Sequence, residues 1–184
     1  MARRSKPPIQ TLIDTIGPPI SSQPWSPSFT AQTLEVLPVG MSDGALFWMK
    51  PMHADSLRVG LPPSATPADV VLDVLKWYPL AAIVVHSTSW RHEEGRIILT
   101  YIAVVARPSA LPPDSLTITP VSRAQIARGE AMAAPKSIGV DAVLEHALRH
   151  LSWLVRDDPS VMQALSEWKH VLADYQPEPF RSLA

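Results

Sequence analysis

Residues 81–106, AAIVVHSTSWRHEEGRIILTYIAVVA, decide the fold of this chain. Two runs rich in β-branched and aromatic residues, 81–90 and 96–106, flank the turn-like sequence HEEGR. Such runs on either side of a short polar stretch with a glycine predict a β-hairpin at the centre of a sheet. We expect a three-residue loop, Glu93-Glu94-Gly95, with Gly95 in the left-handed conformation.

The first strand of this hairpin changes from apolar to polar at His86, in the sequence HSTSW. The predicted loop sets a register in which His92 pairs with Arg96, Trp90 with Ile98, Thr88 with Thr100, and His86 with Ile102. Because side chains alternate between the faces of a sheet, one face then carries His86, Thr88, Trp90 and Thr100. Two hydroxyls, an aromatic wall and a titratable base could line a ligand-binding pocket that is partly open to solvent. The alternative is a strand that leaves the core, with a threonine pair that stabilises the sheet.

One helix and several short strands surround the hairpin in the sequence. The segments with the composition of strands are residues 33–40, 45–50, 56–60 and 115–119. The helix lies in TPADVVLDVLKWYP, where Thr66 is a suitable N-cap and Pro67 a suitable first helical residue. Pro79 ends this helix, because proline cannot continue the hydrogen-bond pattern.

The C-terminal third is predicted to form two helices. The first has an apolar stripe of Val140, Val143, Leu144, Ala147, Leu148, Leu151, Leu154 and Val155. Asp158, before Pro159, caps the second helix, whose stripe contains Val161, Leu165, Trp168 and Leu172. We therefore expect an α+β domain: a mainly antiparallel sheet of about five or six strands, one helix between strands and two C-terminal helices packed on the sheet. This domain should span residues 31–176, followed by a short tail, 177–184.

Residues 1–30 form a proline- and serine-rich segment that reads as a tail. Within it, Ile9, Leu12, Ile13 and Ile16 recur at the spacing of one helix face. A helix this short is marginal by itself, so we expect it to dock on its own domain or on a partner.

His146 and His150 are spaced i, i+4 on the first C-terminal helix, which allows two imidazoles to share a metal. A third ligand would come from elsewhere, such as His53, Asp55 or Glu145. Both histidines lie off the apolar stripe, and a solvated or interface face without metal is the favoured interpretation. Trp153 also lies off the stripe, and a tryptophan there is predicted to be covered by the tail, a loop or another subunit.

The hairpin tip WRHEEGR contains two glutamates beside a glycine, which is similar to the end of a Nudix hydrolase motif. The glycine and the arginine–glutamate pair that this motif requires upstream are missing, so a charged hairpin tip is the favoured interpretation. No glycine-rich phosphate loop and no G-x-S-x-G motif occurs, and no cofactor is predicted.

Composition excludes several classes of function. A net charge of −1 argues against sequence-independent nucleic-acid binding. The chain has no cysteine, which excludes disulfides, thiolate metal sites and a cysteine nucleophile. No apolar stretch approaches the roughly 18 residues of a membrane span, and the basic first residues are not followed by the apolar run of a secretory signal. We expect a soluble cytoplasmic protein.

Two functions fit these observations. The first is a non-catalytic interaction or self-associating domain that uses Ile9, Leu12, Ile13 and Ile16 together with His146 and Trp153, with a protein or a second copy as partner. The alternative is a small-molecule-binding domain or hydrolase with its pocket at His86, Thr88, Trp90 and Thr100.

Overall fold

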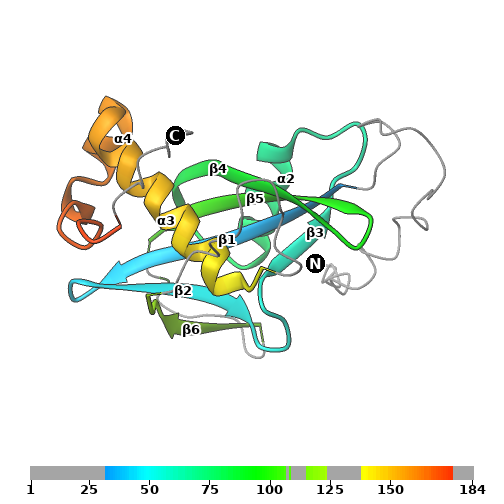
Figure 1. The fold of residues 1–184 in the computed structure, drawn as a ribbon, viewed down its shortest axis with the longest axis horizontal. Helices are drawn as coiled ribbons and strands as arrows, with labels where there is room; N and C mark the ends of the chain where they lie inside the picture. Colours follow the sequence, from blue (N-terminus) through cyan, green and yellow to red (C-terminus); the bar gives the residue numbers. More distant parts are fainter. Residues whose placement is uncertain (1–31, 107, 109–114, 124–137, 176–184) are drawn as a thin grey trace, which may run out of the picture.

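A computed structural model describes residues 32–106, 108, 115–123 and 138–175 of the chain. In these residues six strands form one mixed sheet in the order β4-β5-β1-β2-β6, with β3 also paired to β1 (Figure 1). The strands are β1 (Gln32–Ser42), β2 (Ala45–Pro51), β3 (Leu57–Gly60), β4 (Ala82–Glu93), β5 (Arg96–Val105) and β6 (Leu116–Pro120). The helices are α2 (Pro67–Trp77), α3 (Val140–Asp157), α4 (Pro159–Ala164) and the 3-10 helix η1 (Ser166–Trp168). The predicted α+β fold, with its mainly antiparallel sheet, is confirmed.

Strand β1 is the centre of the sheet and has neighbours on both sides. Its residues Thr33–Val36 pair with β3, and Val39–Ser42 pair with β2, both antiparallel. On its other side β1 pairs in parallel with β5. Parallel neighbours need a long crossover connection, and here α2 lies between them in the sequence.

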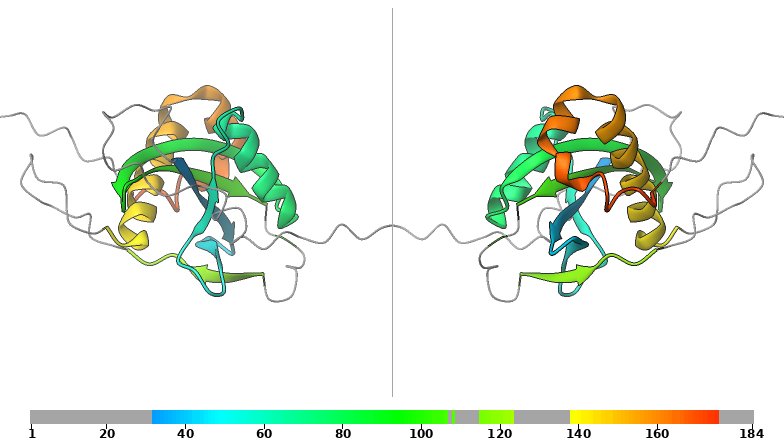
Figure 2. Two further views of the ribbon diagram at one scale, coloured as in Figure 1. Left: turned by 90° about the vertical axis from the view of Figure 1, so that its right-hand side faces the viewer. Right: turned by 90° about the vertical axis from the view of Figure 1, so that its left-hand side faces the viewer.

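Helices cover both faces of the sheet (Figure 2). The face under α3, here called the α3 face, carries a core of Leu37, Val39, Ile102 and Val104 with Leu148, Leu151 and further residues of α3. The opposite face, here called the α2 face, carries Leu34, Val36, Ala103 and Val105, packed with Val71 and Leu75 of α2. Alternate residues of β1 and β5 therefore enter two separate cores, as the period of a strand requires.

The helix starts agree with the caps expected from the sequence. Thr66 Oγ1 accepts a hydrogen bond from Asp69 N at 3.4 Å, and Pro67 is the first residue of α2. Asp158 Oδ1 accepts bonds from Ser160 N and Val161 N at 2.8 and 3.1 Å at the start of α4. These side chains satisfy backbone donors that have no partner inside the helix.

The second C-terminal helix is shorter than predicted. Helix α4 ends at Ala164, and the chain continues as the 3-10 helix η1, where Trp168 N donates to Leu165 O at 2.9 Å. Leu165, Trp168 and Leu172 are nevertheless buried, as their predicted apolar stripe requires. The chain after η1 continues in turns, with Leu172 N donating to Trp168 O at 3.0 Å, so these side chains reach the core without a continuous α-helix.

The β4–β5 loop differs from the prediction. Glu93 pairs with Arg96, so the loop has only two residues, Glu94 and Gly95, with φ angles of 50° and 76°. Two positive φ angles are typical of the two-residue turn whose twist matches a hairpin. Asp43 and Gly44 form the same kind of turn between β1 and β2, with φ angles of 54° and 73°.

Some expected features lie outside the described residues. These are the N-terminal segment with Ile9, Leu12, Ile13 and Ile16, and the C-terminal tail 177–184. Among the helices that the structure does describe, none is both long and apolar enough to cross a bilayer.

Candidate functional site

A buried carboxylate lies at the centre of the sheet. Glu35 of β1 is fully buried on the α3 face. The strand register places Arg58 of β3 on one side of Glu35 and Thr100 of β5 on the other. A charge in this position requires partners, because an unpaired buried charge is strongly unfavourable.

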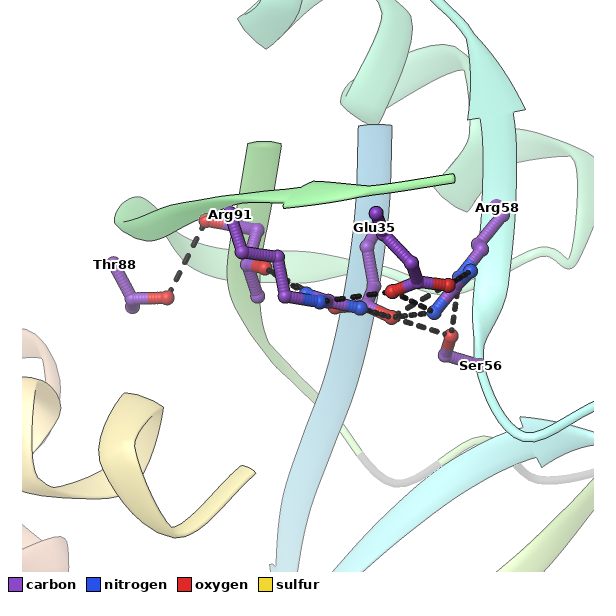
Figure 3. Close-up of polar contacts among 7 residues, drawn as sticks. Glu35, Ser56, Arg58, Thr88 and Arg91 are labelled. Carbon is purple, nitrogen blue, oxygen red and sulfur yellow. Dashed lines mark hydrogen bonds and ion pairs between the residues drawn. The ribbon is translucent and has the colours of Figure 1, made fainter. Parts of the chain in front are cut away.

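Two arginines and two hydroxyls surround this carboxylate (Figure 3). Arg91 Nη1 and Nη2 donate to the two oxygens of Glu35 at 2.7 and 3.0 Å. Arg58 Nε and Nη2 donate to Glu35 Oε1 at 3.2 and 3.1 Å. The hydroxyls of Ser56 and Thr100 donate at 2.7 and 3.1 Å. These bonds connect β1 to β3, β4 and β5.

Glu93 balances the remaining positive charge of this cluster. It accepts bonds from Arg58 Nη1 at 2.6 Å and from Arg91 Nε at 3.0 Å. Each guanidinium nitrogen of Arg58 and Arg91 thus donates to a carboxylate of Glu35 or Glu93. The two arginines are committed to these glutamates, so they are poorly placed to bind an anionic ligand.

The ionic partners also determine the protonation of both glutamates. Burial alone would raise the pKa of Glu35, but the hydrogen bonds and charge of Arg91, with Ser56 and Arg58, lower it below its ordinary value. The pKa of Glu93 is lowered chiefly by its hydrogen bond with Arg58. A carboxylate with a low pKa and several hydrogen bonds is a weak base. The cluster is therefore suited to holding strands together rather than to proton transfer.

The structure corrects the geometry expected for the pocket. Because the loop has two residues, Trp90 pairs with Leu99 and lies on the α2 face, with 68% of its surface exposed. A bulge at Thr88 then restores the predicted pairing of His86 with Ile102. Trp90 and Thr100 are therefore on opposite faces of the sheet, which contradicts the predicted shared face.

The two threonines of the predicted pocket are internal. Thr88 and Thr100 are 7% and 0% exposed. Thr88 Oγ1 donates to the carbonyl of Thr100 at 3.3 Å, while the Thr100 hydroxyl is bonded to Glu35 and Arg91. The expectation of a surface partly open to solvent is wrong for these two residues, because their hydroxyls have partners inside the protein.

Three histidines meet between α3 and β4. The ring centroid of His150 lies 4.8 Å from that of His146 and 6.3 Å from that of His86. Burial lowers the pKa of all three below the ordinary value, and the neighbouring charge of His150 lowers the pKa of His86 and His146 further. The histidine face that the sequence assigned to solvent or an interface is half-buried beside β4.

The third ligands suggested by the sequence do not form a metal-binding group with His146 and His150 in the described part of the chain. His53 and Asp55 are exposed in the loop before β3. Among the residues that the structure describes, no group of three or more histidine or carboxylate side chains has a geometry that could hold a metal ion.

A second buried carboxylate, Glu145 of α3, binds two arginines: Arg149 of the same helix and Arg123, which follows β6 in the chain. Glu145 Oε1 accepts bonds from Arg149 Nε at 3.1 Å and Arg123 Nη2 at 3.0 Å. Arg123 also donates to the carbonyl of Asp174 at 2.8 Å and stacks over the Tyr175 ring at 4.5 Å. The i, i+4 spacing of Glu145 and Arg149 was the sequence signal for this pair.

The cluster around Glu35 was not predicted either, although the sequence contains a signal for it. Its signal was a glutamate inside the apolar strand TLEVLPVG, together with an arginine inside SLRVG. Glutamate is rarely buried without a cation, so Glu35 in a central strand indicates a basic partner.

Comparison with known proteins gives little further guidance. No family model matches the chain, and no curated protein is similar to it. Among solved structures, the chain is similar to the solution structure of the E. coli ORF135 protein, with 14% sequence identity and a TM-score of 0.32. The similar region covers 50% of this chain and 74% of that chain. A likeness of this size carries no conclusion about function.

Proposed function

We propose that this chain is a non-catalytic interaction domain that self-associates through an α3 surface containing His146 and Trp153. The partner element is the N-terminal segment with the apolar residues Ile9, Leu12, Ile13 and Ile16 of a second copy. The observation that carries the proposal is the exposure of Trp153, whose large ring is 47% accessible on an otherwise well-packed helix. Exposed tryptophan is enriched at protein interfaces, where burial of its ring stabilises association.

The histidine contacts define where this ring lies. His146 forms a hydrogen bond with the Thr88 backbone, and the ring of His150 lies near that of His86. Helix α3 and strand β4 thus run in opposite directions here, so the end of α3 lies toward the start of β4. Trp153, one turn beyond His150, therefore lies further along α3 in the direction of the start of β4.

This surface suits a helix better than an added strand. Strand β4 is an edge of the sheet, but it is interrupted by bulges at residues 83 and 88. Bulges at an edge disturb the row of free backbone groups that another strand would need. An amphipathic helix needs only apolar contacts, and the spacing of Ile9, Leu12, Ile13 and Ile16 supplies one such face.

The small-molecule or hydrolase alternative has less support. Its proposed wall, Trp90, lies on the other face from Thr100. The nearest carboxylate to Thr100 is Glu35, which is saturated by hydrogen bonds and has a lowered pKa. A general base needs a free proton-accepting position close to its substrate.

Sedimentation velocity over a range of protein concentrations tests the proposal. Trp153→Ser should shift the protein toward the monomer, with a loss of about tenfold or more in association. Trp77→Ser is the matched control, because Trp77 is 46% exposed at the end of α2, and it should associate like the parent protein. A parent protein that stays monomeric at all concentrations, or equal behaviour of both variants, would contradict the proposal.

A further inference from the structure

Trp90 is the most exposed large apolar side chain among the described residues, at 68%. It nevertheless belongs to an apolar row across the α2 face, formed by Trp90, Leu99, Leu34 and Val59 of four adjacent strands. Leu34 is fully buried, Val59 nearly so, and Leu99 partly buried. The apolar core on this face thus extends to the edge of the sheet, where its last member, the ring of Trp90, is exposed to solvent.

The first residue of β1, Gln32, lies close to this row. Gln32, the first residue of β1, pairs with Ile97, and Ile97 pairs with His92. Leu61 N donates to the carbonyl of Gln32 at 2.9 Å, so the partly buried Leu61 adjoins the same entry point. With about 4.8 Å between strands and about 3.3 Å per residue, the backbones of Gln32 and Trp90 are roughly 12 Å apart.

The sequence immediately before Gln32 suits this surface. Residues 17–31, GPPISSQPWSPSFTA, contain no charged side chain and include Trp25 and Phe29. Phe29 is three residues and Trp25 seven residues before Gln32. At about 3.3 Å per residue, extended chain from Gln32 brings both aromatic rings within reach of Trp90.

The backbone chemistry of this segment also favours contact with a sheet face. Pro24 and Pro27 have no backbone N–H, so they leave no donor unsatisfied when the segment covers an apolar surface. Proline also limits the conformations of the free segment, which lowers the entropic cost of ordering it. Its uncharged side chains avoid the desolvation of charge that a basic or acidic segment would suffer.

We propose that residues 25–29 of the same chain fold back over the α2 face, so that Trp25 and Phe29 cover Trp90 and Leu99. This contact is separate from the α3 surface assigned to self-association and lies on the other face of the sheet. Tethering through only a few residues gives the segment a high effective concentration at Trp90, so the contact forms within one chain.

Fluorine NMR of the full-length protein containing fluorotryptophan tests this contact. The chain has six tryptophans, each of which gives one resonance that a Trp→Phe variant assigns. Phe29→Ser should shift the Trp90 and Trp25 resonances and make that of Trp90 more sensitive to replacement of H2O by D2O. The Trp153 resonance should not move.

A matched control separates this contact from the proposed function. The double variant Ile9→Ser and Ile16→Ser removes apolar side chains from the more distant segment, and it should leave the Trp90 resonance unchanged. A Trp90 resonance that ignores Phe29→Ser, or a response that disappears on dilution because a second copy supplies the segment, would overturn the proposal. Either result would leave the test of Trp153 unaffected.

Discussion

Glu35 and Arg91, which lie on strands separated by β5, form a bidentate ion pair with N–O distances of 2.7 and 3.0 Å. The arginine side chain reaches across β5 above Thr100, whose hydroxyl accepts from Arg91 and donates to Glu35. Arg58 approaches the same carboxylate from β3 on the opposite side. Hydrogen bonds to this one carboxylate therefore connect four strands of the sheet.

Replacement of Glu35 should strongly destabilise the protein. Glu35→Gln keeps the volume of the side chain but leaves two arginines with only Glu93 as an ionic partner. Removing one partner of a buried ion pair typically costs about 3 kcal/mol or more in the free energy of unfolding, which urea denaturation measures. Asp73→Asn is the control, because its pair with Lys76 is exposed and should contribute less than about 1 kcal/mol. A loss for Glu35→Gln no larger than that for Asp73→Asn would show that the buried cluster contributes no more to stability than an exposed ion pair.

Thr100→Val should also reduce stability, in contrast to what a solvent-exposed pocket floor would predict. The change removes a donor to Glu35 and an acceptor for Arg91 in the interior, and a buried group left without its partner costs about 1–3 kcal/mol. Thr88→Val should cost less, because the bond from Thr88 to the Thr100 carbonyl is long, at 3.3 Å. Urea midpoints rank the two variants, and the opposite order would contradict the geometry of the cluster.

Stability should fall with acid in two separate steps. The pKa values of His86, His146 and His150 in the folded protein lie below the ordinary value of 6.5. As the pH falls below about 6.5, the unfolded chain therefore binds protons more readily, and stability is lost until the pH passes the folded pKa values. The pKa values of Glu35 and Glu93 are lowered from 4.5, so their contribution is complete above about pH 4.5 and is lost as the pH falls through the folded values.

Urea midpoints between about pH 7 and pH 5 isolate the histidine step. The double variant His146→Gln and His150→Gln should show a smaller loss over this range than the parent protein. The exposed His53→Gln serves as the control and should follow the parent curve. A parent midpoint that stays constant over the range would contradict the burial of the histidines.

The hairpin turn offers a stabilising substitution. Glu94 has a φ of 50°, a left-handed conformation that asparagine adopts more readily than glutamate. Glu94→Asn should raise the free energy of unfolding by about 0.5 kcal/mol, because an Asn-Gly pair favours this two-residue turn. A lower melting temperature for this variant would argue against the turn.

Local features of the fold could be predicted because their signals lie close together in the sequence. Thr66 and Pro67 mark the start of α2 within a few residues, and the apolar stripe of α3 repeats along one helix. The hairpin was expected for the same reason. Its register was not, because Glu93-Glu94-Gly95 fits a three-residue loop as well as the two-residue turn that forms, and nothing local marks the bulge at Thr88.

The polar cluster was less predictable, since its members come from distant parts of the chain. Arg58 and Arg91 lie 23 and 56 positions after Glu35. The glutamate in an apolar strand indicates that a cation is needed, but choosing between arginines requires the order of the strands. The two-residue loop shifts the pairing of β4 with β5 by one residue and places Trp90 and Thr100 on opposite faces. The predicted pocket therefore depended on whether the loop has two or three residues.

Intermolecular paramagnetic broadening tests whether the N-terminal segment of one chain binds the Trp153 surface of another. Because the chain has no cysteine, Thr11→Cys gives a single site for a nitroxide label, off the apolar stripe of the segment. Labelled chains of ordinary isotopic composition are mixed with isotope-labelled chains, so that only contacts between copies are observed. If the segment binds there, the Trp153 indole resonance is strongly broadened and the Trp77 resonance is broadened little. No broadening at Trp153, or equal broadening over the whole surface, would contradict this binding.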